Sequence, residues 1–505
     1  MLLPFVFSVL FIHDSRSELA GQLCRSVKIE IMQFVTDLHL HSKYSRAVSQ
    51  QMILPEMARW ARLKGLDIIS ASDFTHPLWF RELKSQFKEV SEGLYGLKER
   101  IANNEERKTL FLLTTELSSI YKQREKLRRV HNLVFAPNLE TVEKINKELT
   151  KRAFNLIADG RPILGISSEN LAELLFTIDE NILVVPCHVW TPHFGIYGSA
   201  SGFDSLSEAF GKYSKYIYGI ETGLSSDPEM NWVMSELKTR SILSFSDAHS
   251  GPKMGREATV FELGEPSYEN IRKAITRLSV FSGQLSDTSL SVIRSTDKPK
   301  TEQQKTENRK QKTDNRIIYT IEFYPEEGKY HYSGHRNCGV VRGPEETRKD
   351  GNTCPVCRRR LTEGVLYRVQ ELSEDSLLGR AETKISESGI KWHTDKTKIH
   401  PPFVKLVPLL EVIAEALSST VSSQKVRTIF TNLCESFGSE IEVLLRAEIL
   451  EIDKTGGSKV AEGVDKVRRG DITIDPGYDG EYGKVRIFGD KIEVKDTKSQ
   501  LGLGF

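Results

Sequence analysis

The chain has 505 residues, 39% of them hydrophobic, which is more than one core normally holds, so we expect two to three domains. Its 70 basic and 69 acidic residues nearly cancel, which excludes a globally basic nucleic-acid-binding protein and leaves a local patch for any such partner. Three of its six cysteines lie close together, at 338, 354 and 357, which favours a metal site in a reducing compartment over the disulfide framework of a secreted protein.

Residues 1–31 are the first predicted segment. The stretch Met1–Phe11 is apolar, but it lacks the basic start and the small-residue cleavage site of an export signal. We expect a disordered extension upstream of a start at Met32, with an export signal as the alternative. No later segment reaches membrane-spanning length, so we expect a cytoplasmic protein that does not enter a membrane.

Residues 32–295 alternate strand-like and helix-like stretches, the pattern of an α/β domain with mainly parallel strands. Its first strand, Phe34-Val35-Thr36, leads to His39 and His41. Alternation at the strand period sends both imidazoles to one face, a few Å apart, where they favour a metal ion.

Metal-capable side chains also follow the later strand-like runs of this domain. They are Asp73 and His76 after 66–70, Glu116 after 111–115, His131 after Val130, Cys187 and His188 after 182–186, and Asp247 and His249 after 242–246. A lone histidine beside a strand is usually not a ligand, but this ensemble of imidazoles and carboxylates suits Zn²⁺, Mn²⁺ or Mg²⁺ and can hold two or three ions. Such a centre can activate water and clamp a phosphate, so we infer hydrolysis of a phosphate ester. We interpret Cys187 as a small buried hydrophobe.

These motifs resemble the PHP (polymerase and histidinol phosphatase) family: D-L-H-L-H-S at 37–42, S-D-F-T-H-P at 72–77, T-E at 115–116, H-N at 131–132, C-H at 187–188 and S-D-A-H at 246–249. The resemblance implies a distorted β/α barrel whose metal ligands lie at the carboxyl ends of its strands. It implies as ligands His39, His41, His76, Glu116, His131, His188, Asp247 and His249, with Glu116 bridging two ions.

The chain departs from the family pattern at two places. Phe74 and Thr75 separate Asp73 from His76, which leaves open which of the two binds metal. Ala47 stands where many members have a further ligand, and His193 is either its substitute or a loop residue.

A basic run lies between two of the predicted ligands, at 121–129. It is either a solvated hairpin or, because Glu116 and His131 flank it, a cationic element at the mouth of the metal site that tracks a nucleic-acid backbone.

Residues 296–316 are polar and repetitive, as in a flexible linker. The next predicted module, 317–372, carries two knuckles that bring His335, Cys338, Cys354 and Cys357 to one structural Zn²⁺, with His331 as the alternative to His335. Arg358-Arg359-Arg360 follows and either contacts phosphates or is solvated surface.

Residues 373–505 are predicted to form a helical region with a turn-rich tail. Apolar residues recur at helical spacing over 403–417, 426–437 and 441–450, and the turn-rich P-G-Y-D-G-E-Y-G follows at 476–483.

The order of PHP domain, H-R-N-C and C-P-V-C zinc module, and helical region with this tail resembles the endonuclease Q family over about residues 32–490. The resemblance implies a metal-dependent DNA repair endonuclease that cuts 5′ of deaminated bases (uracil, hypoxanthine, xanthine) and at abasic sites. We assign catalysis to His39, His41, Glu116 and Asp247, and expect a monomer whose partners are damaged DNA and, as candidates, a sliding clamp or other repair proteins. The alternatives are a small-molecule phosphatase of the histidinol-phosphate type and a non-catalytic, metal-stabilised DNA-binding protein.

Overall fold

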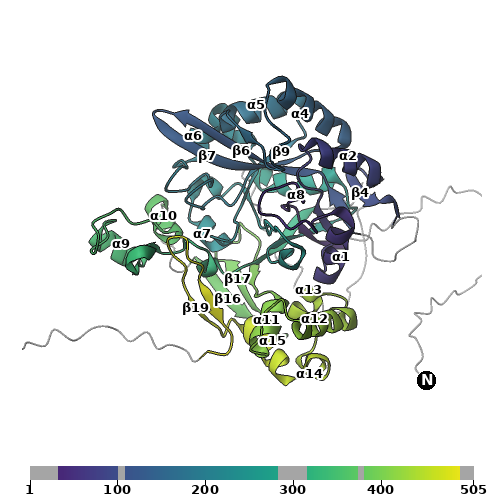
Figure 1. Ribbon diagram of the computed structural model, residues 1–505, viewed down its shortest axis with the longest axis vertical. Coiled ribbons are helices and arrows are strands. Elements are labelled where there is room, and N and C mark those ends of the chain that lie inside the picture. The colour runs from purple at the N-terminus through teal and green to yellow at the C-terminus, as the bar shows by residue number, and fades with distance from the viewer. Residues whose placement is uncertain (1–31, 100–108, 282–314, 374–379, 490–505) are drawn as a thin grey trace, which may run out of the picture.

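The computed structural model describes residues 32–99, 109–281, 315–373 and 380–489. The predicted extension at 1–31 and nearly all of the predicted linker at 296–316 lie outside the described residues. Figure 1 shows the first half of the chain at the top, in purple to teal, and the green and yellow second half below it and to the left.

The first half alternates strands and helices, which confirms the predicted α/β class. Its strands are β1 (Met32–Asp37), β2 (Ile68–Ser70), β3 (Phe87–Ser91), β4 (Leu94–Leu97), β5 (Leu110–Leu112), β6 (Thr114–Gln123), β7 (Lys126–Phe135), β8 (Ile163–Leu164), β9 (Leu183–Pro186), β10 (Gly219–Glu221), β11 (Ser241–Leu243) and β12 (Ala258–Leu263). Its helices are α1 (Leu54–Lys64), α2 (Pro77–Gln86), α4 (Leu139–Lys151), α5 (Ser168–Ile178), α6 (Leu206–Phe210), α7 (Pro228–Trp232) and α8 (Tyr268–Phe281).

The strands of this half form three hydrogen-bonded pieces. Parallel β1, β2 and β5 lie in a ten-stranded sheet, β8-β6-β7-β9 form a second sheet, and β10 pairs with β11 in parallel. A parallel bridge between Leu40 and Ala248 joins the segment after β1 to the one after β11. The strands thus form the distorted barrel that was predicted, and the carboxyl ends of several of them meet around one centre.

Local sequence sets both ends of α1, which packs against α12 (Gln424–Phe437) and α13 (Glu440–Leu445) of the second half. A proline in its first turn starts α1, and Gly65 ends it with φ 89°, a left-handed conformation that costs glycine little. A Cβ on Gly65 would lie 2.5 Å from Ser439 Oγ, so this glycine also allows α1 to approach the second half of the chain.

The second half begins with strands and a small module. The elements are β13 (Arg316–Glu322), β14 (Ser333–His335), β15 (Val340–Arg342), α9 (Pro344–Asp350), α10 (Val365–Leu372), β16 (Ala381–Ile385), β17 (Lys391–Asp395) and β18 (Phe403–Lys405). β13 pairs with β12 on one side and β18 on the other, so the ten-stranded sheet continues across the predicted boundary at 317.

The prediction that a helix begins at Phe403 is wrong for the first residues of that segment. Phe403–Lys405 forms strand β18, because its backbone pairs with β13 and the helix begins only after Pro408. Apolar residues at short spacing fit a buried strand as well as a buried helix, so periodicity alone did not distinguish them.

Five helices and a hairpin follow: α11 (Leu409–Ala416), α12 (Gln424–Phe437), α13 (Glu440–Leu445), α14 (Ile449–Gly456), α15 (Ser458–Arg469), β19 (Thr473–Asp475) and β20 (Lys484–Arg486). Val412, Phe430 and Val464 are among the residues that fill their core. Among the described residues, no helix combines the length and the apolar character needed to cross a membrane.

Candidate metal centre

His39 and His41 lie in the segment that follows β1, and both are fully buried. Their ring centroids are 5.2 Å apart, as the strand period predicts for two imidazoles on one face. His39 Nδ1 lies 2.8 Å from Glu221 Oε1, and His41 Nδ1 lies 3.3 Å from Asp73 Oδ1. Each ring is thus held by a carboxylate at Nδ1, which turns its Nε2 toward the middle of the site.

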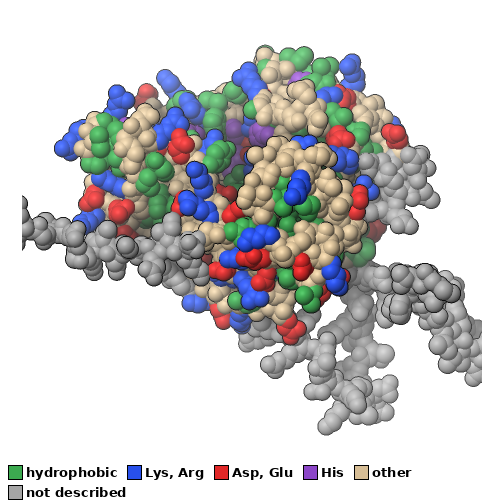
Figure 2. Space-filling view, turned by 60° about the horizontal axis from the view of Figure 1, so that its bottom comes forward, with side chains coloured by type: hydrophobic (Ala, Val, Ile, Leu, Met, Phe, Trp, Pro, Cys, Tyr) green, Lys and Arg blue, Asp and Glu red, His purple; other side chains and the backbone are tan. Residues whose placement is uncertain are grey.

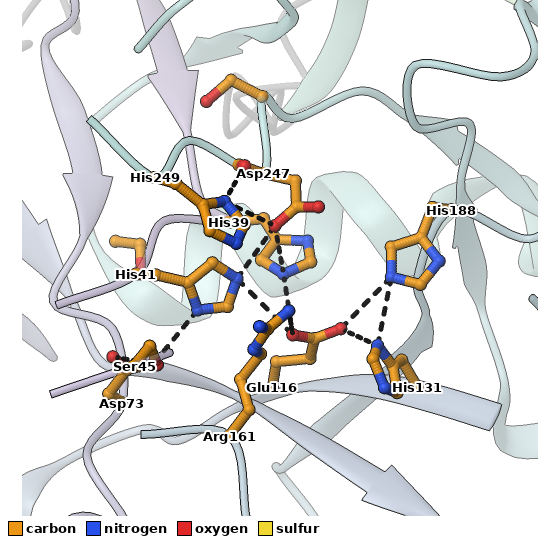
Figure 3. A network of polar contacts seen from close by, with 12 residues as sticks. His39, His41, Ser45, Asp73, Glu116, His131, Arg161, His188, Asp247 and His249 are labelled. Atoms are coloured by element: carbon orange, nitrogen blue, oxygen red, sulfur yellow. Dashed lines mark hydrogen bonds and ion pairs between the residues drawn. The ribbon is translucent and has the colours of Figure 1, made fainter. Parts of the chain in front are cut away.

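Glu116 lies at that middle (Figure 3). Its Oε2 is 3.5 Å from His41 Nε2 and 3.8 Å from His39 Nε2. Its Oε1 is 3.2 Å from His188 Nε2 and also contacts His131 Nδ1. β6 carries Glu116 and the neighbouring β7 carries His131, so one carboxylate faces two groups of imidazoles, the arrangement that a bridging ligand needs.

Asp247 and His249 complete the cluster from the segment after β11. Asp247 Oδ1 lies 2.9 Å from His41 Nε2 and 3.8 Å from His39 Nε2, while His249 Nδ1 lies 2.9 Å from the Asp247 carbonyl oxygen. Asp247 and His188 have φ values of 47° and 31°. Non-glycine residues in this region carry strain of about 1–3 kcal/mol and collect at functional sites, where the surrounding structure holds them in place.

In the part of the chain that the structure describes, two buried atoms of this cluster find no hydrogen-bond partner: His39 Nε2 and Glu116 Oε2. Buried polar atoms without partners are rare, and here they face each other across the centre of the site. Four sets of donor atoms each lie within 4.8 Å of one another: His39, His41 and Glu116; His39, Cys187 and Glu221; His41, Asp247 and His249; and Glu116, Cys187 and His188. These residues therefore fit more than one divalent cation held mainly by nitrogen and oxygen.

The electrostatics of the site agree with that fit. Burial would raise the pKa of Glu116, but His131 and the other imidazoles hold it well below its ordinary value. Burial likewise works against an ionised Asp247, yet the hydrogen bond from His41 and the charge on His39 lower its pKa. Both carboxylates are therefore ionised near neutral pH, the form that binds a cation.

His39 shows the opposite shift. Burial would lower its pKa, but the charge on Glu221, its hydrogen bond to that carboxylate and the nearby carboxylate of Glu116 raise it well above its ordinary value. A proton on this ring and a divalent cation compensate the same negative charge, so the two compete for it.

Asp73 and His76 do not join the metal groups. Asp73 Oδ2 accepts hydrogen bonds from the Ser42 amide and hydroxyl, both 2.6 Å away, and from Ser45 Oγ at 2.9 Å. With its other oxygen it contacts His41 Nδ1. His76 stacks on Tyr44, and its Nε2 lies 3.3 Å from the Ile157 carbonyl oxygen, away from the centre.

Two further residues at the site were missed by the sequence reasoning. Glu221 ends β10, is fully buried, and accepts a hydrogen bond from the His188 amide at 2.8 Å in addition to its contact with His39. Like Glu116, it follows a short run of mainly apolar residues in the sequence, and that signal would have found it. Arg161 Nη1 lies 3.6 Å from Glu116 Oε2, but it comes from a loop without any periodic signal.

The remaining site candidates lie as follows. Cys187 is fully buried in a core cluster with Leu133 and Phe245, and burial raises the pKa of its thiol. His193 contributes to the wall of the neighbouring cavity, and its ring is 6.3 Å from that of Tyr330. Ala47 has φ 61° and offers no ligand atom.

A cavity of about 420 Å³ opens onto the metal cluster. Its walls come from the first half of the chain, from 323–330, and from the tail, and they include four cationic side chains: Arg161, Lys253, Arg256 and Lys329. Figure 2 shows histidine side chains at the floor of a hollow on this face, with Lys and Arg side chains around it.

The four residues of the second predicted metal site, in the zinc module, also lie close together. The donor atoms of His335, Cys338, Cys354 and Cys357 lie within 4.8 Å of one another, and Cys357 Sγ is 3.3 Å from His335 Nδ1. His331 is buried against Tyr332 outside this group, so the geometry selects His335 over His331. Burial opposes ionisation of Cys354, but hydrogen bonds from the Cys357 amide and from His335 lower its pKa to about 6. A set of three thiols and one imidazole fits a closed structural zinc site.

The chain was compared with family models and with known proteins, and matches were found in both. Residues 408–471 match the family described as the MJ0043 C-terminal domain. The uncharacterized protein MJ0043 of Methanocaldococcus jannaschii is 30% identical over 311 residues, which are 60% of this chain but only 32% of that protein. The match therefore spans about a third of that relative's length.

Two solved structures match over 92% of the chain, each at 29% identity. One is the lesion-specific endonuclease PfuEndoQ from Pyrococcus furiosus, with a TM-score of 0.70 and 98% of that chain covered. The other is an endonuclease Q bound to a 27-mer duplex with an abasic lesion at its active site, with a TM-score of 0.69 and 99% of that chain covered.

Proposed function

The chain is an endonuclease Q-like protein, and from this premise we propose that it is a metal-dependent DNA repair endonuclease that hydrolyses the backbone 5′ of deaminated bases and at abasic sites. The observation that carries the proposal is the position of the Glu116-centred ligand cluster at the floor of a cavity walled by both halves of the chain. A phosphatase for small esters needs no wall from the second half.

The ligand set supports hydrolysis rather than binding alone. Two or three ions of Zn²⁺, Mn²⁺ or Mg²⁺ would supply an activated water and stabilise negative charge at the phosphate. The residues that would hold them are His39, His41, Glu116, His131, His188, Asp247 and His249.

The chain's own residues bind and orient the substrate. Arg161 lies beside Glu116, and Lys253 and Arg256 lie in the same cavity wall, so the anionic phosphodiester meets cations where it approaches the ligands. Asp73 and Glu221 fix the orientation of His41 and His39 through their Nδ1 atoms.

Selection of the lesion follows from access to the cavity. A base inside a duplex cannot reach a site at the floor of a cavity, so the nucleotide leaves the stack, which costs least where the base is missing or mispaired. Abasic sites and deaminated bases such as uracil, hypoxanthine and xanthine meet that condition.

The basic run at 121–129 belongs to the β6–β7 hairpin that carries Glu116 and His131. Lys122, Arg124 and Lys126 are exposed at its end, whereas the Arg128 guanidinium lies 4.1 Å from the centroid of the Phe203 ring. The exposed side chains are placed to contact phosphates of a duplex that reaches beyond the cavity. The monomeric state and a sliding-clamp partner remain predictions from the sequence.

The test is cleavage of an end-labelled duplex with a single uracil, hypoxanthine or abasic site. We expect a nick on the 5′ side of the lesion that requires an added divalent ion and is abolished by a chelator. Asp247→Asn removes a ligand oxygen and should lower nicking by at least about 100-fold while the duplex still binds.

His76→Ala is the matched control, because His76 is also a buried histidine of a metal-ligand motif yet points away from the centre. It should retain nicking. Turnover of a simple phosphomonoester without DNA cleavage would support the phosphatase instead, and lesion binding with no cleavage by any divalent ion would support the non-catalytic protein.

A further inference from the structure

Tyr482 lies where two hollows meet. It contributes to the wall of the cavity at the metal centre, and it also lines a second hollow of about 540 Å³ formed by the zinc module and the tail. It is 65% exposed, and Lys329 Nζ lies 4.5 Å from the centroid of its ring. A single exposed aromatic is common on protein surfaces, so its position and support decide whether it has a role.

The backbone that carries Tyr482 is tightly held. The Gly477 amide donates to the Glu326 carbonyl at 2.8 Å, the Gly480 amide to the Lys329 carbonyl at 2.9 Å, and the Gly483 amide to the Glu327 carbonyl at 3.0 Å. A Cβ on Gly483 would lie 2.3 Å from the Glu326 carbonyl oxygen, so only glycine permits this approach. The exposed ring is therefore presented on a fixed loop, and little conformational entropy is lost when it makes a contact.

The charge around the ring suits a nucleic acid more than a protein partner. Lys329, Arg336 and Lys484 stand on the two hollows. Two acids share the second hollow: Glu481 lies 3.8 Å from Arg336 in an exposed pair, and Asp475 is paired with Arg486. Exposed pairs of this kind are weak, so a phosphate can compete for the cations.

An extruded nucleotide leaves a gap in the base stack. The two bases that flanked it each lose one stacked face, and an aromatic side chain can replace the missing surface. Tyr482 borders the cavity that would receive the extruded nucleotide and exposes its ring beside it.

We infer that Tyr482 stacks on the nucleobase next to the extruded nucleotide and holds the opened DNA in register with the metal centre, with Lys329 against the ring and the adjoining phosphate. This inference rests on the proposed function, and it gives the tail a direct role in recognition. Tyr482 is a positioning residue, because it acts on the neighbouring base and not on the phosphate that is cut.

The experiment uses the full chain and a duplex with one abasic site, with 2-aminopurine placed directly 5′ or directly 3′ of the lesion. The fluorescence of 2-aminopurine falls when it is stacked. We expect the wild type, without added divalent ion, to quench it at one of the two positions. Tyr482→Ala should remove this quenching and weaken lesion binding about tenfold, as for other aromatics that stack on bases.

Two variants separate stacking from a general effect. Tyr482→Phe keeps the ring and should restore both quenching and affinity. Tyr216→Ala is the matched control, since Tyr216 is likewise exposed and has a lysine amine, that of Lys215, 4.9 Å from its ring; it should behave as the wild type.

The outcomes distinguish this inference from the proposed function. Nicking by the wild type, together with unchanged quenching and affinity in Tyr482→Ala, would overturn the stacking role alone. A wild type that neither binds nor nicks any lesion duplex would overturn the proposed function and this inference with it.

Discussion

At the scale of single residues, carboxylates hold the rings of two candidate ligands, His39 and His41, through their Nδ1 atoms. Glu221 contacts His39 Nδ1 with one oxygen and accepts from the His188 amide with the other, so it fixes two ligand-bearing segments at once. Partners of this kind orient the imidazole, fix its tautomer and raise its basicity.

Glu221→Gln tests that support. The amide keeps the shape of the side chain but removes the charge that faces His39, so we expect metal affinity or activity to fall by about 10- to 100-fold. The measurement is the metal concentration that half-activates lesion cleavage. Unchanged half-activation, with correct folding shown by circular dichroism, would remove Glu221 from the working site.

The residue scale also shows what sequence reasoning can and cannot find. His39 and Asp247 could be predicted because each follows a short strand, β1 or β11, whereas Glu116 lies within β6 and not after a strand. The sequence could not show that Asp73 contacts His41 while His76 lies apart, because this depends on the local turn. Ser72 and Asp73 have φ values of 48° and 40°, and the chain then leads His76 away from the centre. Arg161 lies in a loop, where spacing carries no directional information.

At the scale of elements, one buried ion pair joins helices from the two halves. Lys64 Nζ of α1 lies 2.6 Å from Glu440 Oε2 of α13, and the two side chains are 2% and 5% exposed. Glu440 Oε1 also accepts from the Leu409 amide at 3.0 Å. Breaking a buried pair leaves one charge without compensation, which costs about 3–5 kcal/mol.

Lys64→Met should therefore lower the free energy of unfolding by about 3–5 kcal/mol in urea denaturation. The double variant Lys64→Met/Glu440→Gln removes both charges and should recover most of the loss. Equal stability of the single and double variants would show that Glu440 does not depend on Lys64.

The junction of β13 with the first half predicts a pH dependence. Glu322, at the end of β13, is fully buried, and burial raises its pKa to about 8 despite hydrogen bonds from Ser244, Thr320 and Thr222. A carboxyl whose pKa is higher in the folded state stabilises the fold below its unfolded pKa, near 4.5, and that stabilisation is lost as the pH rises toward 8. Glu322→Gln cannot ionise, so it should be more stable relative to the wild type at pH 8 than at pH 5, measured as urea midpoints. An equal difference at the two pH values would contradict this account.

At the scale of the whole molecule, the ten-stranded sheet makes the two halves one structural unit. β13 lies between β12 and β18, so removal of the second half would expose the edge of β12 and the surfaces that β13 covers. Exposed edges of this kind pair with other chains.

A fragment of residues 32–295 should consequently aggregate, or unfold at a lower urea concentration than the full chain. Light scattering measures the aggregation, and circular dichroism measures the urea midpoint. A monomeric fragment with the midpoint of the full chain would show that the sheet does not couple the halves. The sequence predicted an α/β first part, a zinc module and a helical region. It did not predict that one sheet joins them, because strand pairing between distant segments leaves no local signal.

The tail that borders the cavity also has a consequence for the order of synthesis. The candidate metal ligands lie between His39 and His249, whereas Tyr482 and Gly483, which belong to the wall of the same cavity, are translated much later. A nascent chain therefore contains these residues before this part of the cavity wall exists. The wall is completed only when the tail reaches the segment 326–329, so under the proposed function recognition of the lesion is the last property that the chain acquires during synthesis.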